Sequence, residues 1–159
     1  MLKNIVMLKE EYMLDKFIKL TEDIFEGASD EEVSRRKLEW KEIKLKEALE
    51  DIKSRSKLNV DGALDIRGDV DLCGLGLTEI PLKFGIVGGR FDCSGNYLTS
   101  LKNCPSVVGG SFNCYVNYLT SLEGCPMSVG GAFDCCDNKV KFTEKDVKEH
   151  CYVTGYIYT

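Results

Sequence analysis

The chain has 159 residues, of which 43% are hydrophobic, and its 26 acidic and 21 basic side chains give a formal charge of −5. A chain of this length can bury one core, and its negative balance argues against a nucleic-acid partner, which would need a basic patch or stripe. No apolar run approaches the roughly 18 residues of a membrane span. The N-terminus lacks the apolar core and cleavage site of a secretory signal, so we expect a cytoplasmic protein with no membrane partner.

Residues 1–58 predict a helical segment of two helices, at about 3–26 and 30–56. Apolar residues recur along the first stretch at the spacing of one helix face. Ser29 and Glu32 form the sequence pattern of a capping box, which predicts the start of the second helix. That helix contains no Gly or Pro.

The apolar residues of the second helix divide between two nearly opposite faces. We expect one face to pack on the first helix and the other to cover the open end of the domain that follows. The alternative leaves the face of Val33, Trp40 and Ile43 for another subunit or a target, because large aromatic residues are common interface anchors.

Residues 63–66 and 69–72 alternate polar and apolar side chains around Arg67 and Gly68, which predicts an entry hairpin of two short strands joined by a tight turn. Val70 lies 21 residues before Phe91, so the second strand is in phase with the repeats that follow.

Two near-copies of one pattern, Val87 to Leu101 and Val108 to Leu122, stand in tandem with a 21-residue period, and a third begins at Val129. Strand side chains alternate between two faces, so the Phe and Cys of each copy share one face, which we expect to be buried. An Asn at the turn can bond backbone groups that the turning chain leaves unpaired. The expected inward columns are Phe91, Phe112 and Phe133; Cys93, Cys114 and Cys135; and Asn96, Asn117 and Asn138.

Thr143 is a candidate N-cap for a short helix that ends near His150, with Asp146 in the capping-box position. Residues 153–158 then predict a last strand with Tyr156 and Tyr158 on its outer face. An edge strand invites pairing with another chain, so we expect a homodimer through this edge or through the helices.

The pattern Cys-Pro-x-x-Val-Gly-Gly-x-Phe-x-Cys-x-x-Asn-x-Leu-Thr-Ser-Leu resembles the short bacterial type of leucine-rich repeat. In its Cys-bearing, Gly-Gly form it is similar to small repeat proteins encoded by tailed bacteriophages. The resemblance covers residues 59–159 and implies a short leucine-rich-repeat solenoid of parallel strands. With the two N-terminal helices as a capping hairpin and a C-terminal capping helix and strand, we expect the chain to have an α+β fold, an α/β solenoid. The resemblance also implies a surface that binds protein rather than a reaction.

The cysteines and the single histidine favour no catalytic, metal or cofactor site. Three of the eight cysteines occupy the buried repeat slot, and no C-x-x-C pair is present, so we expect neither zinc nor disulfides. His150 and Cys151 are neighbours that point apart on a helix, which argues against a nucleophile and base. The Gly-Gly pairs lack the ending of a phosphate loop. We therefore predict no enzyme activity.

Alternate strand residues point away from the core and form the candidate partner-binding surface, expected on the concave strand face. Its columns are acidic, and a row of like charges costs stability, which favours use over simple solvation. The candidate residues are Asp65, Asp71, Arg90, Asp92, Asn113, Tyr115, Asp134, Tyr156 and Tyr158.

We therefore expect a module that binds another protein, one with a basic patch. The phage resemblance implies an inhibitor that blocks a host antiviral defence protein in the host cytoplasm. The alternative is a structural protein that assembles into an oligomeric particle.

Overall fold

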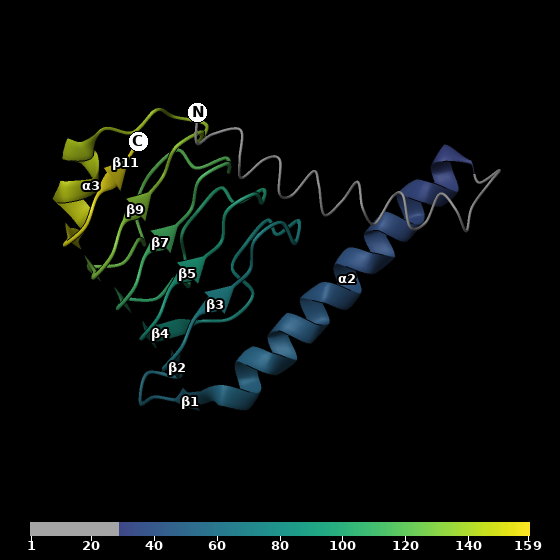
Figure 1. Ribbon diagram of the computed structural model, residues 1–159, viewed down its shortest axis with the longest axis horizontal. Helices are drawn as coiled ribbons and strands as arrows, with labels where there is room; N and C mark the ends of the chain where they lie inside the picture. Colours follow the sequence, from purple (N-terminus) through teal and green to yellow (C-terminus); the bar gives the residue numbers. More distant parts are fainter. Residues whose placement is uncertain (1–28) are drawn as a thin grey trace. The chain divides into compact units, whose positions relative to one another are not determined.

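The computed structural model describes residues 29–159 (Figure 1). The chain divides into two compact units, Met1–Trp40 and Lys41–Thr159, with the boundary inside helix α2 (Asp30–Arg55). The boundary expected between residues 58 and 59 therefore falls within the second unit. The helix predicted at about 3–26 lies outside the described residues, so the helical hairpin stays a prediction.

Helix α2 is confirmed close to its predicted bounds. The Ser29 hydroxyl accepts a hydrogen bond from the backbone N–H of Glu32 at 3.3 Å, as an N-cap does. The Glu32 carboxylate forms an ion pair with Arg36 at 2.8 Å, which ties together the first two turns. Towards its C-terminal end the helix buries Ile52 and packs Leu45 against the core of the second unit.

The second unit is a solenoid of short strands, and each coil gives one strand to each of two sheets (Figure 1). The six-stranded sheet has the order β1 (Ser56–Leu58), β2 (Leu64–Ile66), β4 (Phe84–Val87), β6 (Val107–Val108), β8 (Ser128–Val129) and β10 (Tyr152–Val153). The five-stranded sheet contains β3 (Val70–Asp71), β5 (Phe91–Asp92), β7 (Phe112–Asn113), β9 (Phe133–Asp134) and β11 (Ile157–Tyr158).

The pairing is parallel throughout, except between β1 and β2. Phe91 pairs with Phe112, and Phe112 pairs with Phe133, so the register follows the 21-residue period of the sequence. The parallel solenoid with this period is therefore confirmed.

The expected entry hairpin is wrong, because β2 and β3 belong to different sheets. The antiparallel partner of β2 is β1, and the loop between them is held by Asn59, whose side-chain oxygen accepts N–H bonds from Asp61 and Ala63. Arg67 and Gly68 occupy the slot of the Gly-Gly pairs, where every coil leaves one sheet and enters the other. The last strand divides at the same corner, into β10 and β11.

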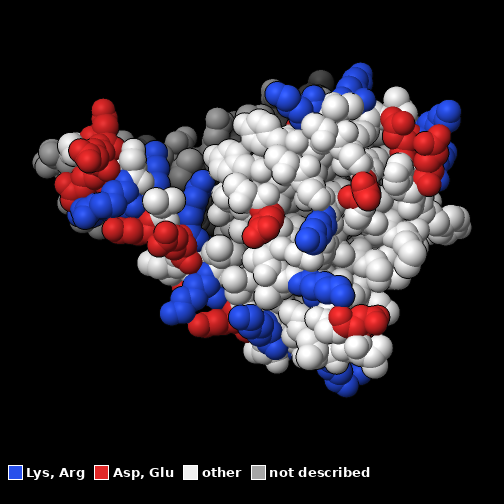
Figure 2. All heavy atoms as spheres, turned by 180° about the vertical axis from the view of Figure 1, so that it is seen from behind, with Lys and Arg blue, Asp and Glu red and all other residues white. Residues whose placement is uncertain are grey.

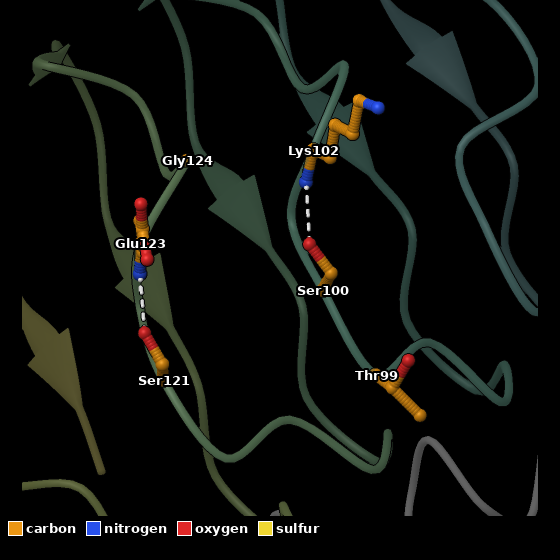
Figure 3. A pocket seen from close by; sticks show the side chains of 6 residues that line it. All are labelled: Thr99, Ser100, Lys102, Ser121, Glu123 and Gly124. Carbon is orange, nitrogen blue, oxygen red and sulfur yellow. Dashed lines mark hydrogen bonds between the residues drawn. The ribbon is translucent and has the colours of Figure 1, made fainter.

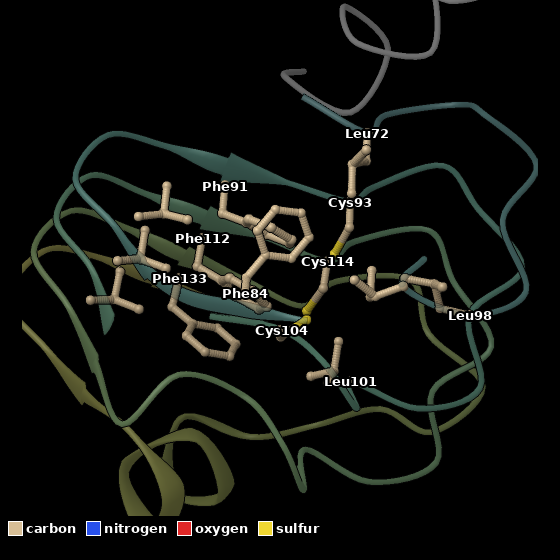
Figure 4. Close-up of a cluster of buried hydrophobic side chains, with 14 of the residues drawn as sticks. Leu72, Phe84, Phe91, Cys93, Leu98, Leu101, Cys104, Phe112, Cys114 and Phe133 are labelled. Atoms are coloured by element: carbon tan, nitrogen blue, oxygen red, sulfur yellow. The ribbon is translucent and has the colours of Figure 1, made fainter. Parts of the chain in front are cut away.

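The predicted inward columns form the core (Figure 4). The rings of Phe91 and Phe112 stack with centroids 5.8 Å apart, and those of Phe112 and Phe133 lie 5.1 Å apart. Cys93 and Cys114 are fully buried beside them. The core is therefore a ribbon one coil thick, extended by each repeat.

The Asn ladder is also confirmed, and it joins each coil to the one before. The Asn117 side-chain oxygen accepts the N–H of Leu98 at 2.9 Å, while its amide donates to the carbonyls of Cys93 and Cys114. The Asn117 side chain thus forms hydrogen bonds with backbone groups of the preceding coil. Leu75 fills the same slot in the first coil, which has no such coil before it, and packs against the core instead.

Helix α3 (Glu144–His150) begins at the predicted capping box. The backbone N–H and the hydroxyl of Thr143 both donate to the Asp146 carboxylate at 2.7 Å, and these bonds lower the pKa of Asp146.

Candidate protein-binding surface

The outer face of the five-stranded sheet brings most of the predicted surface residues together. Strand register places Asp71, Asp92, Asn113, Asp134 and Tyr158 side by side in one outward column. Adjacent strands lie about 4.8 Å apart, so neighbouring side chains in the column are within reach of one another.

A second outward column lies beside the first and is formed by the residues two positions earlier in each coil. It contains Asp69, Arg90, Ser111, Ala132 and Tyr156. Its short side chains also tie coils together: Asp69 accepts the backbone N–H of Arg90 at 2.7 Å, and the Ser111 hydroxyl accepts that of Ala132 at 3.1 Å.

Asp92 is not the open, outward-facing carboxylate that the sequence predicts, because it is only 5% exposed. One oxygen accepts from the backbone N–H and the hydroxyl of Ser94, and the other lies 3.3 Å from the Arg90 guanidinium and 3.1 Å from the Asn113 amide. Asp92 is therefore a structural acceptor whose oxygens contact four groups from three residues.

The other carboxylates of the column are more open. Asp71 lies 3.8 Å from the guanidinium of Arg90, and its side chain is 65% exposed. Asp134 is half-buried and accepts the N–H of Cys136 at 3.0 Å. Within residues 29–159, no basic side chain pairs with Asp134, so its charge is not neutralised there.

Asp65 was placed in the same column by alternation, and this is wrong. It lies in β2 of the six-stranded sheet, where its side-chain oxygen accepts the N–H of Ile86 at 2.8 Å and the amide of Asn59 at 3.1 Å. The error follows from the misplaced hairpin, which put β2 and β3 on one surface. Tyr115 is half-buried in the loop after β7.

Tyr156 and Tyr158 end the face as an aromatic pair. They are 77% and 50% exposed, and their ring centroids lie 6.4 Å apart in a tilted arrangement. Two large exposed rings beside polar groups are typical of interaction surfaces.

Sequence reasoning missed a second aromatic pair. Tyr97 and Tyr118 are each about half exposed and stack with ring centroids 6.0 Å apart. The signal was present, because both follow the Asn of the repeat and precede a buried Leu, a position that faces outward in every coil.

The face predicted on α2 is partly open. Ile43 is 56% exposed and Val33 is 36% exposed, whereas Trp40 is half-buried. Leu38, which belongs to the other apolar cluster of the helix, is also exposed.

Two of the cavities in the described part of the second unit are shallow and are lined by polar or charged side chains. The larger, of about 440 Å³, is lined by Thr99, Ser100, Lys102, Ser121, Glu123 and Gly124 (Figure 3). The Ser100 and Ser121 hydroxyls already accept N–H bonds from Lys102 and Glu123. The smaller lies along α3 between charged side chains.

The thiols of the core are poorly suited to chemistry. Burial raises the pKa of Cys151 to about 11, so at neutral pH its thiol is protonated and weakly nucleophilic. His150 bonds the carbonyl of Asp146 through Nδ1 at 2.9 Å. Among residues 29–159, no three His, Cys, Asp or Glu side chains converge as metal ligands.

On the face of the second unit that Figure 2 shows, charges of both signs are scattered among uncharged side chains, and acidic and basic groups adjoin one another at its edge. Within residues 29–159, no helix is both long and apolar enough to cross a membrane.

Comparison with protein-family models, curated proteins and solved structures finds no match for this chain. The resemblance to leucine-rich repeats and to phage proteins therefore depends on the repeat motif alone.

Proposed function

We propose that this chain is a non-enzymatic module that binds another protein through the outer face of the five-stranded sheet. The observation that carries the proposal is the register of that face: five coils place three carboxylates, an amide and a tyrosine in one outward column. Asp71, Asp134, Tyr156 and Tyr158 remain accessible on it. An acidic and aromatic surface of this kind complements a basic patch and gains specificity and association rate from the charges.

The partner we propose is a host protein. The repeat motif resembles the short leucine-rich repeats of tailed-bacteriophage proteins, and this resemblance supports a phage-encoded inhibitor. It would occupy a component of host antiviral defence in the host cytoplasm. Occupation of a surface needs no catalytic group in the inhibitor.

Affinity capture from an extract of the native host, followed by mass spectrometry, tests the proposal. The test variant changes Asp71→Lys and Tyr158→Lys on the face. The matched control changes Asp61→Lys and Tyr152→Lys, another exposed Asp and Tyr that lie outside it. We expect one host protein in a stoichiometric complex, retained by the control and lost from the test variant. Capture that survives in both variants would move the interface away from this face.

Self-assembly is the second candidate function, and the sheet ends favour it. Strands β10 and β11 are the last strands of the two sheets in the described chain, and Tyr152 and Tyr156 are both exposed there. A second copy that pairs with these edges would give a homodimer or a larger particle. Light scattering over a range of concentrations separates the candidates, because a monomeric mass at all concentrations would contradict assembly.

A further inference from the structure

Arg90 shows how this face holds a guanidinium. The side chain rises from the column beside Asp92, and its nitrogens lie 3.3 Å from the Asp92 carboxylate and 3.8 Å from that of Asp71. Guanidinium groups match carboxylates in shape and charge, so Arg90 compensates the charge of the buried Asp92 and reduces the negative potential at Asp71.

Two coils later, the position of Asp92 again holds an aspartate, but the position of Arg90 does not hold an arginine. Ala132 stands 42 positions after Arg90, and Asp134 stands 42 positions after Asp92. Ala132 has only a methyl group, so no side chain corresponding to that of Arg90 reaches Asp134 from its own coil. The Asp134 carboxylate has no basic partner within the described chain.

The next coil places two tyrosines, Tyr156 and Tyr158, next to Ala132 and Asp134. Tyr158 is the register partner of Asp134, and Tyr156 precedes it beside Ala132, where its carbonyl accepts the N–H of Phe133 at 2.9 Å. The two rings lie 6.4 Å apart and are both exposed. Rings flanking a carboxylate attract a cation through their faces while the acid binds its N–H groups.

We propose that Ala132, Asp134, Tyr156 and Tyr158 form a site for one arginine side chain of a protein partner. The inference rests on the proposed function and names the chemistry of the partner. Arginine fits better than lysine, because a planar guanidinium can stack on a tyrosine ring and still donate two parallel bonds to the carboxylate. The partner's arginine would stand towards Asp134 as Arg90 stands towards Asp92.

The direct test is an NMR titration of the labelled protein with the peptide acetyl-Gly-Arg-Gly-amide, up to 20 mM. We expect saturable shifts centred on Asp134, Tyr156 and Tyr158, weakened by added salt. Citrulline in place of arginine keeps the length and planarity of the side chain but removes its charge and replaces one nitrogen by a carbonyl oxygen, and we expect at least fivefold weaker binding.

Two variants locate the site. Ala132→Arg restores the internal arginine of the earlier coil and is expected to weaken peptide binding at least tenfold by self-occupation. Ser128→Arg adds the same charge on the other sheet and is expected to leave binding within twofold. Asp134→Asn removes the charge but keeps an oxygen that can accept the Cys136 N–H, and it should weaken peptide binding at least fivefold. This variant tests the site independently, should Ala132→Arg fail to fold.

Absence of saturable shifts, equal binding of the citrulline peptide, or unchanged binding by Asp134→Asn would each overturn the inference. If the titration shows no peptide binding but host capture is still lost in the Asp71→Lys, Tyr158→Lys variant, the arginine site is overturned and the proposed function stands. Capture that survives in the Asp71→Lys, Tyr158→Lys variant, with peptide binding to the wild-type protein intact, contradicts the proposed function alone.

Discussion

Val116 adopts a left-handed backbone conformation with φ of 52°, in the slot that Gly95 fills one coil earlier with φ of 63°. The conformation turns the chain so that the next residue, Asn117, can donate to the carbonyls of Cys114 and Tyr115. A β-branched residue rarely adopts this conformation, since its Cβ approaches the neighbouring carbonyl. Val116 is therefore held in a strained conformation by the hydrogen bonds that the Asn117 side chain forms.

Replacing Val116→Gly should stabilise the protein. Left-handed backbone costs a non-glycine residue about 1–2 kcal/mol, and the greater freedom of Gly in the unfolded chain offsets roughly 0.5–1 kcal/mol of that. We expect the free energy of unfolding to rise by about 0.5–1 kcal/mol in urea titrations. The reciprocal change, Gly95→Val, should lower it, and a Val116→Gly protein less stable than the wild type would contradict this account.

At the scale of elements, the sequence predicted the coil but not its corner. The run Val-Gly-Gly-x-Phe reads as one strand, because Val and Phe both face inward. The chain turns at the Gly pair, so Val108 enters one sheet and Phe112 the other. Strands of two residues are too short for alternation to reveal the break. This one ambiguity produced both the wrong entry hairpin and the undivided last strand.

The corner requires glycine because the coils approach closely there. A Cβ on Gly109 would collide with the backbone carbonyl oxygen of Gly88 in the coil before, and one on Gly130 would meet that of Gly109. A Cβ on Gly110, the second glycine of the corner, would lie 2.8 Å from the backbone carbonyl carbon of Gly89. Gly110→Ala should therefore lower the free energy of unfolding by about 1–3 kcal/mol, the range of an overpacked core. Urea denaturation measures the loss.

Gly68→Ala is the matched control. Gly68 occupies a corner slot of the first coil, where the nearest atom to an added Cβ is the flexible end of Arg55 at 3.4 Å. We expect a change below about 0.5 kcal/mol. Equal losses in the two variants would show that glycine is needed for its backbone freedom rather than for the contact between coils.

At the scale of the whole molecule, the inward-facing residues were predictable and the use of the outward ones was not. Phe112, Cys114 and Asn117 recur at a fixed period, so each copy supports the others. The burial of Asp92 depends on Arg90 and Ser94, which occur in one coil only. Deviations between copies, rather than the shared pattern, therefore determine which surface groups are open to a partner.

The stacked core also makes stability sensitive to alkaline pH. Burial raises the pKa of Cys104 and Cys114 well above the ordinary 9.0 and raises that of Cys125 and Cys135 to about 12. The folded state thus holds these thiols protonated, while the unfolded chain ionises near pH 9. Their contribution is complete below pH 9 and is lost as pH rises from 9 towards the folded-state values.

Urea titrations under reducing conditions at pH 8, 9.5 and 10.5 should therefore show a steep fall in the free energy of unfolding. Each fully buried thiol contributes up to about 1.4 kcal/mol per pH unit above its unfolded pKa. The double variant Cys104→Ala, Cys114→Ala removes two such groups, so its loss between pH 8 and 10.5 should be smaller, whatever its stability at pH 8. Equal losses in both proteins would mean that exposed groups, and not the buried thiols, cause the alkaline transition.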